Sequence, residues 1–421
     1  MKKYFFLLII IGFVFRLLLF DVAHHGDLNN NISWGKELWN RGIVDYYGSS
    51  YSEDWPYSAP NQPPLYILTY ATTSYLYDSI DSSIRSVNDK VRIFPSNLVW
   101  FWESSGMRLC VKLPSILADV GIAWLIYKYF QKKDAKKALI LCALWLFNPI
   151  SWYNSSVWGQ NDAIVNFFGM LAIFALLSKR LAKTSLWYSM SFVFKGSILV
   201  FGPILGIFAF RQTYGVRKWL KAILVFVLVV TITSVWFMPS AYFPVWLVDL
   251  YQNRILPGEI GYLTANAFNF WWLIDSGKTL DSTVYLGLSA RVWGLLFMST
   301  VYLYVGIRTW KGKLNDKNLF LSLVLISLAT FLFMTRVHER YLYPVFPIAT
   351  LGLFYFRWLI IPYVVLSVVY LLNMYHLFFA PSILMVEKLF TQNYFTHLLV
   401  AVNLIVFVYF LYKYHSNYEP G

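Results

Sequence analysis

Apolar runs that approach the thickness of a lipid bilayer constrain this chain more than any other feature. A membrane helix needs about 20 consecutive apolar residues, and residues 4–20, 108–128 and 359–378 come close to that length. Only 13% of the 421 residues are charged, whereas a soluble domain usually has about 25%. The chain therefore lacks the polar residues to cover a water-facing surface, and the sequence predicts an all-α polytopic membrane protein.

Basic residues predict how such a protein is oriented. Lys and Arg gather in cytoplasmic loops, and Lys2 and Lys3 place the N-terminus on that side. A signal peptide is the alternative interpretation of the N-terminal run, but Arg16 interrupts its apolar core and no small-residue cleavage site follows. We expect a retained first helix. The net charge of +14 then follows from topology, so no nucleic-acid partner is expected.

The alternation of apolar runs and basic loops predicts a single domain over residues 1–421, with a bundle of about 11–13 membrane helices. Residues 21–107 and 240–282 form two large external loops, and both termini are cytoplasmic. Pro63 and Pro64 favour the start of a short interfacial helix in the first loop, because proline is tolerated in a first turn. Other membrane helices are expected at residues 138–150, 163–177, 222–239, 283–306, 318–334, 342–356 and 396–412.

The apolar segment 184–210 has basic residues on both sides. It is too short for two full spans, and one span would invert every later loop. We therefore predict two short helices that meet near Lys195 and Gly196. Such a break is tolerated where the backbone is buried in protein or lines a cavity, so Lys195 is expected to project into the bundle.

Four polar clusters share the predicted external face, although they lie far apart in the sequence. They are HHGDLNNN, SEDWPYSAPNQPPLY, NSSVWGQND and TRVHERY. Acids, histidines, arginines and aromatic residues that meet at one interface are what a catalytic pocket requires. The residues expected to line this pocket, besides the catalytic ones below, are His24, His25, Asp54, Gln160, Asp162, His338 and Glu339.

Asp27 has two interpretations. The polar run that it opens precedes an amphipathic stretch, which suits a helix N-cap. A carboxylate at a partly dehydrated interface also suits a general base that takes a proton from an acceptor hydroxyl. His24 and His25 would tune this acid, bind a metal or be solvated. A divalent cation lacks a third plausible ligand nearby, so neither a metal nor another cofactor is expected.

The segment 336–340 carries four charged or titratable side chains at the outer end of a helix. One interpretation is an interfacial anchor with an ion pair between Glu339 and Arg340. The other is an anion site, because the planar guanidinium groups of Arg336 and Arg340 suit phosphate oxygens. Arg16, in the outer turns of the first helix, is expected near the same headgroup level.

Two further acids each have a structural and a functional interpretation. Asp119 lies in mid-helix, where an ionisable group is costly and normally faces a partner or a cavity. It would pair with Lys195 or Arg16, or carry protons in a transporter. Asp162 is either the N-cap of the next helix or a polar wall of the pocket.

Three stretches together resemble a known family. They are KLPSILADVGIAWLIYKYF, LWLFNPISWYNSSVWGQNDAI and VHERYLYPVFPI. With the acid that opens the large first loop, they resemble the GT-C membrane glycosyltransferases, and among these the bacterial and archaeal mannosyltransferase-like proteins. Those proteins are related to the eukaryotic enzyme that adds the second mannose to GPI anchors. The resemblance runs from Arg16 to about Pro347.

The resemblance implies a function and roles for particular residues. It implies transfer of a sugar, most plausibly mannose, from a polyprenyl-phosphate donor on the external face of the cytoplasmic membrane of a bacterium or archaeon. Asp27 matches the base, and Arg340 and Arg336 match the donor-phosphate ligands, with Lys195 and Arg16 as further cations. Lys195 is followed here by glycine, where relatives often have proline, so the geometry of the break stays open.

The implied partners are the lipid-linked donor, membrane lipids and an acceptor that is a glycolipid, a glycan or a protein. The competing hypothesis is a proton-coupled transporter or a flippase of lipid-linked sugars, which Asp119, Lys195 and the broken helix would favour. A scaffold protein without activity is a third hypothesis, but it would not need acids at the interface.

Overall fold

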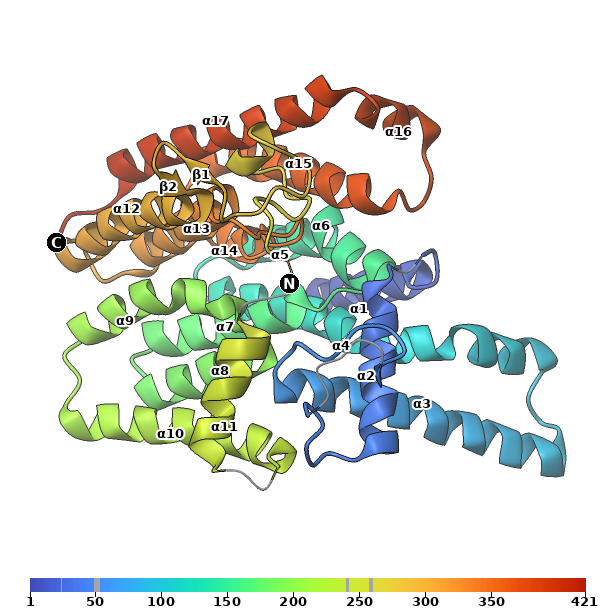
Figure 1. Cartoon of the computed structure of the whole chain (residues 1–421). Coiled ribbons are helices and arrows are strands. Elements are labelled where there is room, and N and C mark those ends of the chain that lie inside the picture. Colours follow the sequence, from blue (N-terminus) through green and yellow to red (C-terminus); the bar gives the residue numbers. More distant parts are fainter. Residues whose placement is uncertain (24, 49–53, 240–241, 257–259) are drawn as a thin grey trace.

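Helices account for almost all of the regular structure of the chain. The computed structural model describes residues 1–421 except 24, 49–53, 240–241 and 257–259, and within these residues it forms helices α1 to α17 (Figure 1). The strands of the described part, β1 (Val284–Tyr285) and β2 (Leu288–Ser289), form one small antiparallel hairpin. The predicted all-α class is confirmed.

Six helices of the described residues are long and apolar enough to cross a membrane. The first helix, α1 (Lys2–Leu19), is also apolar, but Lys2, Lys3 and Arg16 add three charges to its 18 residues. This defines an all-α protein with membrane-spanning helices. The six are α4 (Ser96–Phe130), α10 with its 3-10 extension (Val216–Phe237), α12 (Ala290–Lys311), α13 (Asp316–Phe333), α15 with the preceding 3-10 turn (Arg357–Phe378) and α17 (Asn393–Asn417).

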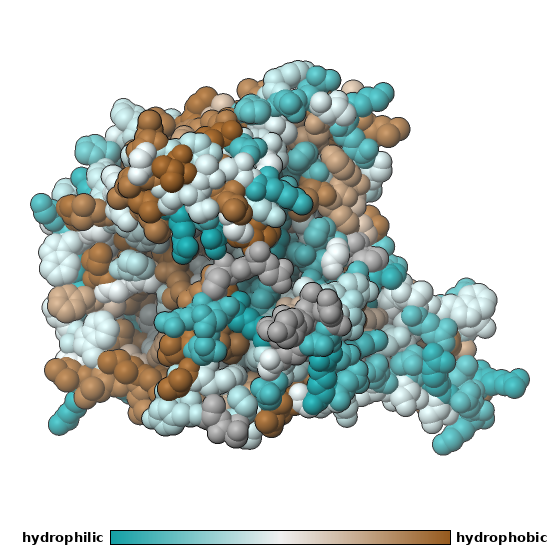
Figure 2. All heavy atoms as spheres, in the orientation of Figure 1, coloured by the Kyte–Doolittle hydropathy of each residue, from teal (hydrophilic) through white to brown (hydrophobic). Residues whose placement is uncertain are grey.

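Apolar side chains on the outer helices are exposed, as a lipid environment requires. On α1, Ile10 and Leu18 are 58% and 75% exposed, and the two positions share one face of the helix. Figure 2 shows hydrophobic residues spread over the surface of the bundle. By contrast, α13 is buried along most of its length. The bundle therefore has a packed centre and an apolar outer surface.

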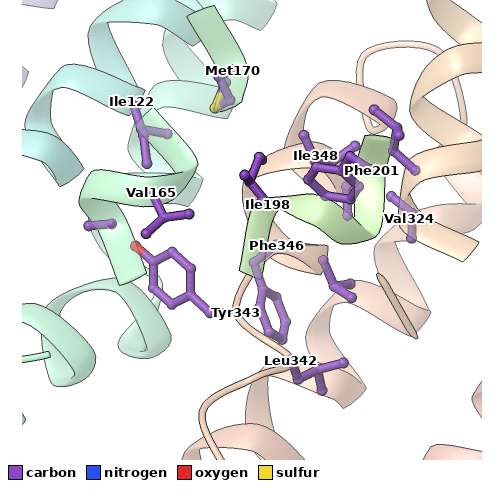
Figure 3. Packing of buried hydrophobic residues seen from close by; sticks show 14 of the residues in the cluster. Ile122, Val165, Met170, Ile198, Phe201, Val324, Leu342, Tyr343, Phe346 and Ile348 are labelled. Carbon is purple, nitrogen blue, oxygen red and sulfur yellow. The ribbon is translucent and has the colours of Figure 1, made fainter. Parts of the chain in front are cut away.

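The packed centre surrounds the broken segment that the sequence predicts at Lys195. Figure 3 shows Ile198 and Phe201 of this segment packed among buried side chains from neighbouring helices. Three elements make up the segment: α8 (Leu181–Phe194), the 3-10 helix η3 (Gly196–Phe201) and α9 (Gly202–Arg211). Lys195 has an extended backbone between α8 and η3, and it is only 8% exposed. Both the predicted break and the inward position of Lys195 are confirmed.

The first loop, residues 21–107, contains more helix than predicted. It forms α2 (Asp27–Arg41), α3 (Pro64–Val91) and the first turns of α4. The helix predicted to start at Pro64 is confirmed, but it is longer than expected. Figure 1 shows α3 and the start of α4 projecting from the bundle as a hairpin. The rings of Tyr77 and Trp102 stack across it at 5.6 Å.

The second loop, residues 240–282, folds back onto the membrane helices. Between α11 (Phe243–Leu250) and α12, residues 263–269 form an irregular and mostly buried stretch. The amide N–H of Phe268 donates to Asn373 Oδ1 at 2.9 Å, and Asn403 Nδ2 donates to the carbonyl of Phe268 at 2.9 Å. Buried backbone needs such partners, so two helix asparagines hold this loop in place.

Other helix bounds differ from the sequence-based expectation. The helix expected at 138–150 is α5 (Ala135–Leu146), which ends before a turn that begins with a proline. The helix expected at 283–306 is α12, which starts later because the β-hairpin occupies 284–289. The helix expected at 342–356 is the shorter α14 (Val345–Gly352). The remaining short elements are α6 (Pro149–Trp152), the π-helix η2 (Tyr153–Trp158), α7 (Asp162–Leu177), η5 (Tyr251–Ile255), η6 (Phe270–Leu273) and α16 (Leu384–Phe390).

Both chain termini belong to one end of the bundle. The ring of Phe5 stacks on Tyr127, near the end of α4, at 4.0 Å. Lys133, just after α4, pairs with Asp316 at the start of α13 at 2.9 Å. The tail residue Glu419 forms an ion pair at 2.9 Å with the lysine that follows Asp316. Because α13 runs away from this end, the segment that follows α13 lies at the opposite end.

Candidate active site

A cavity of about 600 Å³ lies where α2, the break before η3 and the segment after α13 meet. Its walls come from six stretches of the chain. The described residues that line it are Asp27, Asn30, Asn31, Trp34, Ser58, Asn61, Gln62, Tyr66, Gln160, Asn161, Lys195, Gly196, Ser197, Val200, Ile255, Leu256, Ile260, Met334, His338, Arg340 and Tyr341.

Asp27 begins α2 and faces this cavity. The N-cap of α2 is Gly26, without a side-chain capping bond, so the N-cap interpretation of Asp27 is wrong. Gln160 Nε2 donates to Asp27 Oδ2 at 2.5 Å, and the backbone N–H of Asp27 donates to His25 Nδ1 at 3.2 Å. The side chain of Asp27 is 36% exposed. The carboxylate is thus oriented by two neighbours yet open to a ligand.

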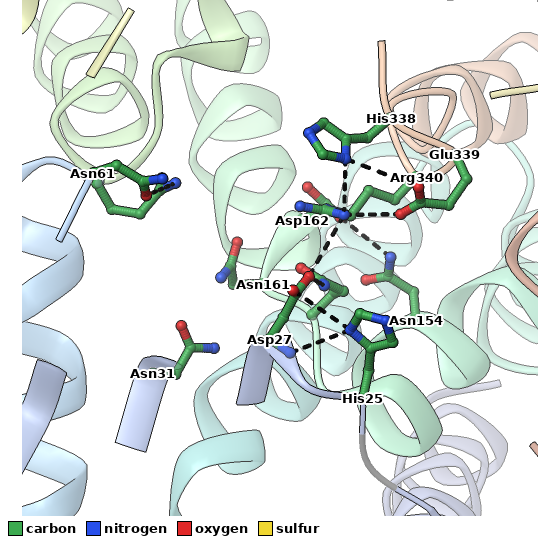
Figure 4. Close-up of polar contacts among 12 residues, drawn as sticks. His25, Asp27, Asn31, Asn61, Asn154, Asn161, Asp162, His338, Glu339 and Arg340 are labelled. Atoms are coloured by element: carbon green, nitrogen blue, oxygen red, sulfur yellow. Dashed lines mark hydrogen bonds and ion pairs between the residues drawn. The ribbon is translucent and has the colours of Figure 1, made fainter. Parts of the chain in front are cut away.

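Arg340 lies close to Asp27 (Figure 4). Its Nη1 is 3.5 Å from Asp27 Oδ2 and donates to Glu339 Oε1 at 2.8 Å. The Nε atom is buried and has no hydrogen-bond partner within the described residues. The ion pair with Glu339 that the sequence allowed is therefore present, and Arg340 also lines the cavity.

The electrostatics of the site favour an ionised Asp27. Burial by itself would raise the pKa of this carboxyl, but the guanidinium of Arg340 and the hydrogen bonds with His25 and Gln160 hold it below its ordinary value. Burial, assisted by the neighbouring Arg340, lowers the pKa of His338 well below its ordinary value. The site at neutral pH therefore holds a carboxylate, an uncharged His338 and a fixed cation.

Lys195 supplies a second cation to the cavity wall. Its Nζ donates to Asp162 Oδ1 at 2.8 Å, and Asn154 Nδ2 donates to Asp162 Oδ2 at 3.2 Å. The ammonium also lies 5.6 Å from the ring centroid of Tyr341. The N-cap of α7 is Asn161, again without a side-chain capping bond. The capping interpretation of Asp162 is therefore wrong, and Asp162 instead holds Lys195 in the wall.

Lys112 of α4 is a structural residue that sequence reasoning missed. Its buried Nζ lies 2.6 to 2.9 Å from four backbone carbonyl oxygens, which share its three N–H donors: those of Phe20, Ala23, Ser156 and Val157. One ammonium thus joins the segment before Asp27 to the π-helix before Gln160. The signal available in the sequence was a lysine inside a predicted membrane span, which is costly unless it has partners.

Gly159 completes this junction. Its φ of +88° lies in the left-handed region, which glycine adopts without strain. A Cβ at this position would lie 2.9 Å from a methyl carbon of Leu28 and 3.0 Å from Lys112 Cε. The turn that presents Gln160 to Asp27 therefore requires glycine for two independent reasons.

Arg16 does not lie where the sequence predicted. It is fully buried, with its Nε 3.4 Å from Asp119 Oδ2 and its Nη2 donating to Ser151 Oγ at 2.8 Å. Ser155 Oγ and Tyr343 Oη donate to the same carboxylate, each at 2.6 Å. This places Arg16 in a closed network inside the bundle and outside the described cavity lining, because the partner acid lies at mid-helix depth.

Arg336 and Asp54 also lie outside the described cavity lining. Arg336 makes a two-point ion pair with Asp281, with its Nε 2.7 Å from Oδ2 and its Nη2 3.0 Å from Oδ1. It therefore fastens the second loop rather than facing the cavity. The carbonyl of Asp54 accepts from Arg41 at the edge of the first loop. The sequence could not foresee either partner, and His24 lies outside the described residues.

Of the other expected pocket residues, Gln160 and His338 line the cavity, whereas His25 and Glu339 contact residues that do. Within the described residues, no group of three His, Cys, Asp or Glu side chains is placed to hold a metal ion. The groups placed to hold an anion are the guanidinium of Arg340 and the ammonium of Lys195. The site therefore combines one carboxylate with two cations.

Sequence reasoning missed most of the uncharged lining. Asn30, Asn31 and Trp34 follow Asp27 at the i+3, i+4 and i+7 positions of α2, which share one helix face. All three line the cavity. This spacing was the available signal, but carboxamides stand out less than charges.

No protein-family model matches the chain, and no curated protein matches it.

Proposed function

We propose that this protein is a membrane glycosyltransferase that moves a sugar from a polyprenyl-phosphate donor to an acceptor hydroxyl, with mannose as the preferred sugar. A single observation carries the proposal. Asp27, Lys195, His338 and Arg340 come from three distant segments and border one cavity at one end of a bundle of apolar helices. A lipid-linked substrate would reach such a site from the bilayer.

The proposed roles follow from charge and position. Asp27, ionised at neutral pH, accepts the proton of the acceptor hydroxyl as that oxygen attacks the first carbon of the sugar. Lys195 and Arg340 stabilise the negative charge that develops on the departing lipid phosphate. The bond from the sugar to the phosphate breaks as the bond to the acceptor oxygen forms, and the phosphate leaves with the electron pair.

The arrangement of the cations separates the base from the leaving group. Arg340 meets Asp27 through Nη1 and leaves Nε unpaired within the described residues, while Lys195 lies on another part of the wall. A phosphate held by the guanidinium of Arg340 and by Lys195 would leave room for the sugar next to Asp27. This supports displacement with inversion, in which base and leaving group act on opposite faces of the sugar.

The proposed setting is the cytoplasmic membrane of a bacterium or archaeon, with the cavity on the external face and both termini in the cytoplasm. The common location of the two termini, at the end of the bundle away from the cavity, supports this orientation. Asp119, which motivated the transporter hypothesis, has its carboxylate engaged by Arg16, Ser155 and Tyr343, which gives that hypothesis no support.

The test is release of polyprenyl phosphate from synthetic polyprenyl-phosphate mannose, with purified protein in detergent and a total membrane-lipid extract as acceptor. Asp27→Asn should lower the rate at least about 100-fold, as expected for loss of a general base, while donor binding persists. Asp89→Asn, on the exposed hairpin, is the matched control and should match wild type. Wild-type-like turnover in Asp27→Asn would remove Asp27 as the base, and no release by wild type would reject the proposed reaction.

A further inference from the structure

Two asparagines of α2 form a wall of the cavity that has no role in the chemistry described so far. We propose that Asn30 and Asn31 bind the sugar of the lipid-linked donor, through hydrogen bonds that their amide N–H groups donate to its hydroxyl oxygens. This inference rests on the proposed function and adds to it the residues that recognise the sugar.

The orientation of Asn30 is fixed by a backbone donor. The N–H of Ser58 donates to Asn30 Oδ1 at 3.1 Å. A backbone N–H can only donate, so the atom that faces it must be the carboxamide oxygen. The Nδ2 group of Asn30 therefore points elsewhere, has no partner in the part of the chain that the structure describes, and belongs to a residue that lines the cavity.

A relay of hydrogen bonds through the hydroxyl of Tyr66 orients Asn31. Asn161 Nδ2 donates to Tyr66 Oη at 2.6 Å, and Tyr66 Oη donates to Asn31 Oδ1 at 2.6 Å. All three residues line the cavity and are at least 95% buried. Because the oxygen of Asn31 is used by Tyr66, its Nδ2 remains for a ligand; that nitrogen has no partner among the described residues.

Helix geometry places these two amides at the right separation from Asp27. Residues three and four positions along an α-helix lie about 5–6 Å away on the same face, which is close to the width of a hexose ring. One turn further along α2, Trp34 Nε1 donates a hydrogen bond to the carbonyl of Ser58 at 2.7 Å. The indole therefore offers the cavity its ring rather than its N–H, a surface that suits the C–H face of a sugar.

The chemistry of this wall separates it from the phosphate site. The two cations of the cavity, Lys195 and Arg340, belong to other segments. Asn30 and Asn31 are neutral donors, and they match hydroxyl oxygens that accept hydrogen bonds. The sugar of the donor would thus lie along α2, with its first carbon toward Asp27 and its phosphate toward the cations.

Asn30→Asp and Asn31→Asp isolate the proposed contacts. In each variant a carboxylate oxygen still accepts from Ser58 N–H or Tyr66 Oη, and only the group that faces the cavity changes from donor to acceptor. Asn88→Asp is the matched control. Asn88 Oδ1 likewise accepts from a backbone N–H, that of Phe94 at 3.3 Å, on the projecting hairpin.

The measurement compares the dissociation constants of two probes, polyprenyl-phosphate mannose and bare polyprenyl phosphate, for detergent-purified protein. Asn30→Asp and Asn31→Asp should weaken binding of the mannose-linked lipid at least about tenfold and change binding of the bare lipid much less. Asn88→Asp should match wild type with both probes. Melting temperatures show whether each variant folds. If Asn31→Asp lowers the melting temperature strongly, the test rests on Asn30→Asp, because Asn30 is partly exposed.

Three results would overturn the inference. Equal weakening with both lipids would show a charge effect alone, and no weakening would show no contact with the sugar. Wild-type protein that binds both lipids equally well would show that the sugar adds nothing to affinity, while the proposed donor class would stand. Wild-type protein that binds neither lipid would instead reject the proposed function, and the sugar site with it.

Discussion

As the proposed general base, Asp27 has to meet two opposing demands. A general base must be ionised before it can take a proton, yet a carboxylate whose pKa is strongly lowered accepts protons poorly. Here Arg340 and the hydrogen bonds of His25 and Gln160 outweigh the effect of burial and keep Asp27 ionised. Arg340 is also the cation proposed for the donor phosphate, so a bound phosphate would compete with Asp27 for it and make the carboxylate more basic.

The first prediction concerns the pH dependence of kcat/KM, which reports the free enzyme. The lowered pKa of Asp27 keeps it ionised as the pH falls, until well below the ordinary aspartate value of about 3.9. Wild type should therefore show no loss of kcat/KM from Asp27 protonation between about pH 5 and pH 8. Arg340→Gln removes the nearest cation, raises the pKa of Asp27 and should move an acid limb upward. A wild-type acid limb centred above about pH 5 would contradict this.

The second prediction concerns the ion pair between Lys195 and Asp162, whose side chains are only 10% and 8% exposed. Lys195→Met leaves a buried carboxylate without its cation, which costs about 3–5 kcal/mol of unfolding free energy. The double variant Lys195→Met/Asp162→Asn should recover part of the loss. In contrast, Glu37→Gln breaks a partly exposed pair with Arg41 and should cost less than about 1 kcal/mol. Thermal melting in detergent measures all three, and equal melting of Lys195→Met and wild type would show that the pair is not needed.

At the scale of elements, local signals were predictable and long-range ones were not. The helix start at Pro64 and the break at Lys195 follow from proline chemistry and from the length available for spans. The early start of α4 at Ser96 could not be predicted, because the first turns of this helix lie outside the apolar run. The short α14 (Val345–Gly352) read as a full span, because hydropathy does not register where the chain turns inside a buried region.

The site follows the same division. Asp27 and Arg340 were found because charges at the edge of apolar runs are conspicuous. Arg16 and Arg336 were equally conspicuous charges, but their partners lie about 100 and about 55 positions away in the sequence. The spacing of residues along the chain does not reveal such distant partners. Asn31, like the other carboxamides of the lining, gave a weak signal because it is neutral.

The third prediction tests the packing of α2, which positions Asp27 and both asparagines. At Gly35 a Cβ would lie 2.4 Å from the carbonyl oxygen of Tyr70 and 2.7 Å from Ser74 Oγ, so α2 and α3 touch closely there. Gly35→Val should therefore separate the two helices, lower the melting temperature and reduce sugar transfer. At Gly26 a Cβ would meet nothing within 4 Å, so Gly26→Ala should leave both unchanged. A fully active Gly35→Val would show that α2 tolerates displacement.

At the scale of the whole molecule, the candidate site and the chain termini lie at opposite ends of the bundle. The cavity lies beyond the far end of α13 (Asp316–Phe333), while the start of α13 packs with the C-terminal tail. An 18-residue helix is about 27 Å long, close to the thickness of the hydrocarbon layer. The two ends of the molecule would therefore face different compartments.

The fourth prediction follows from this separation. The native Cys110 and Cys142 are buried, so wild type should react little with a membrane-impermeant thiol reagent on intact cells. Lys36→Cys, on the exposed side of α2, should react from outside. Lys132→Cys and Lys313→Cys, in exposed loops at the terminal end, should react only after the membrane is opened. Reaction of all three from outside would reject the proposed orientation.

Lys112 has a practical consequence. Its amine is fully enclosed by the carbonyls of two segments, the one that leads to Asp27 and the one that leads to Gln160. Reagents that acylate primary amines should therefore spare it as long as these segments stay together, while they modify exposed lysines freely. Acylated Lys112, detected by mass spectrometry, would therefore report that these two segments have separated.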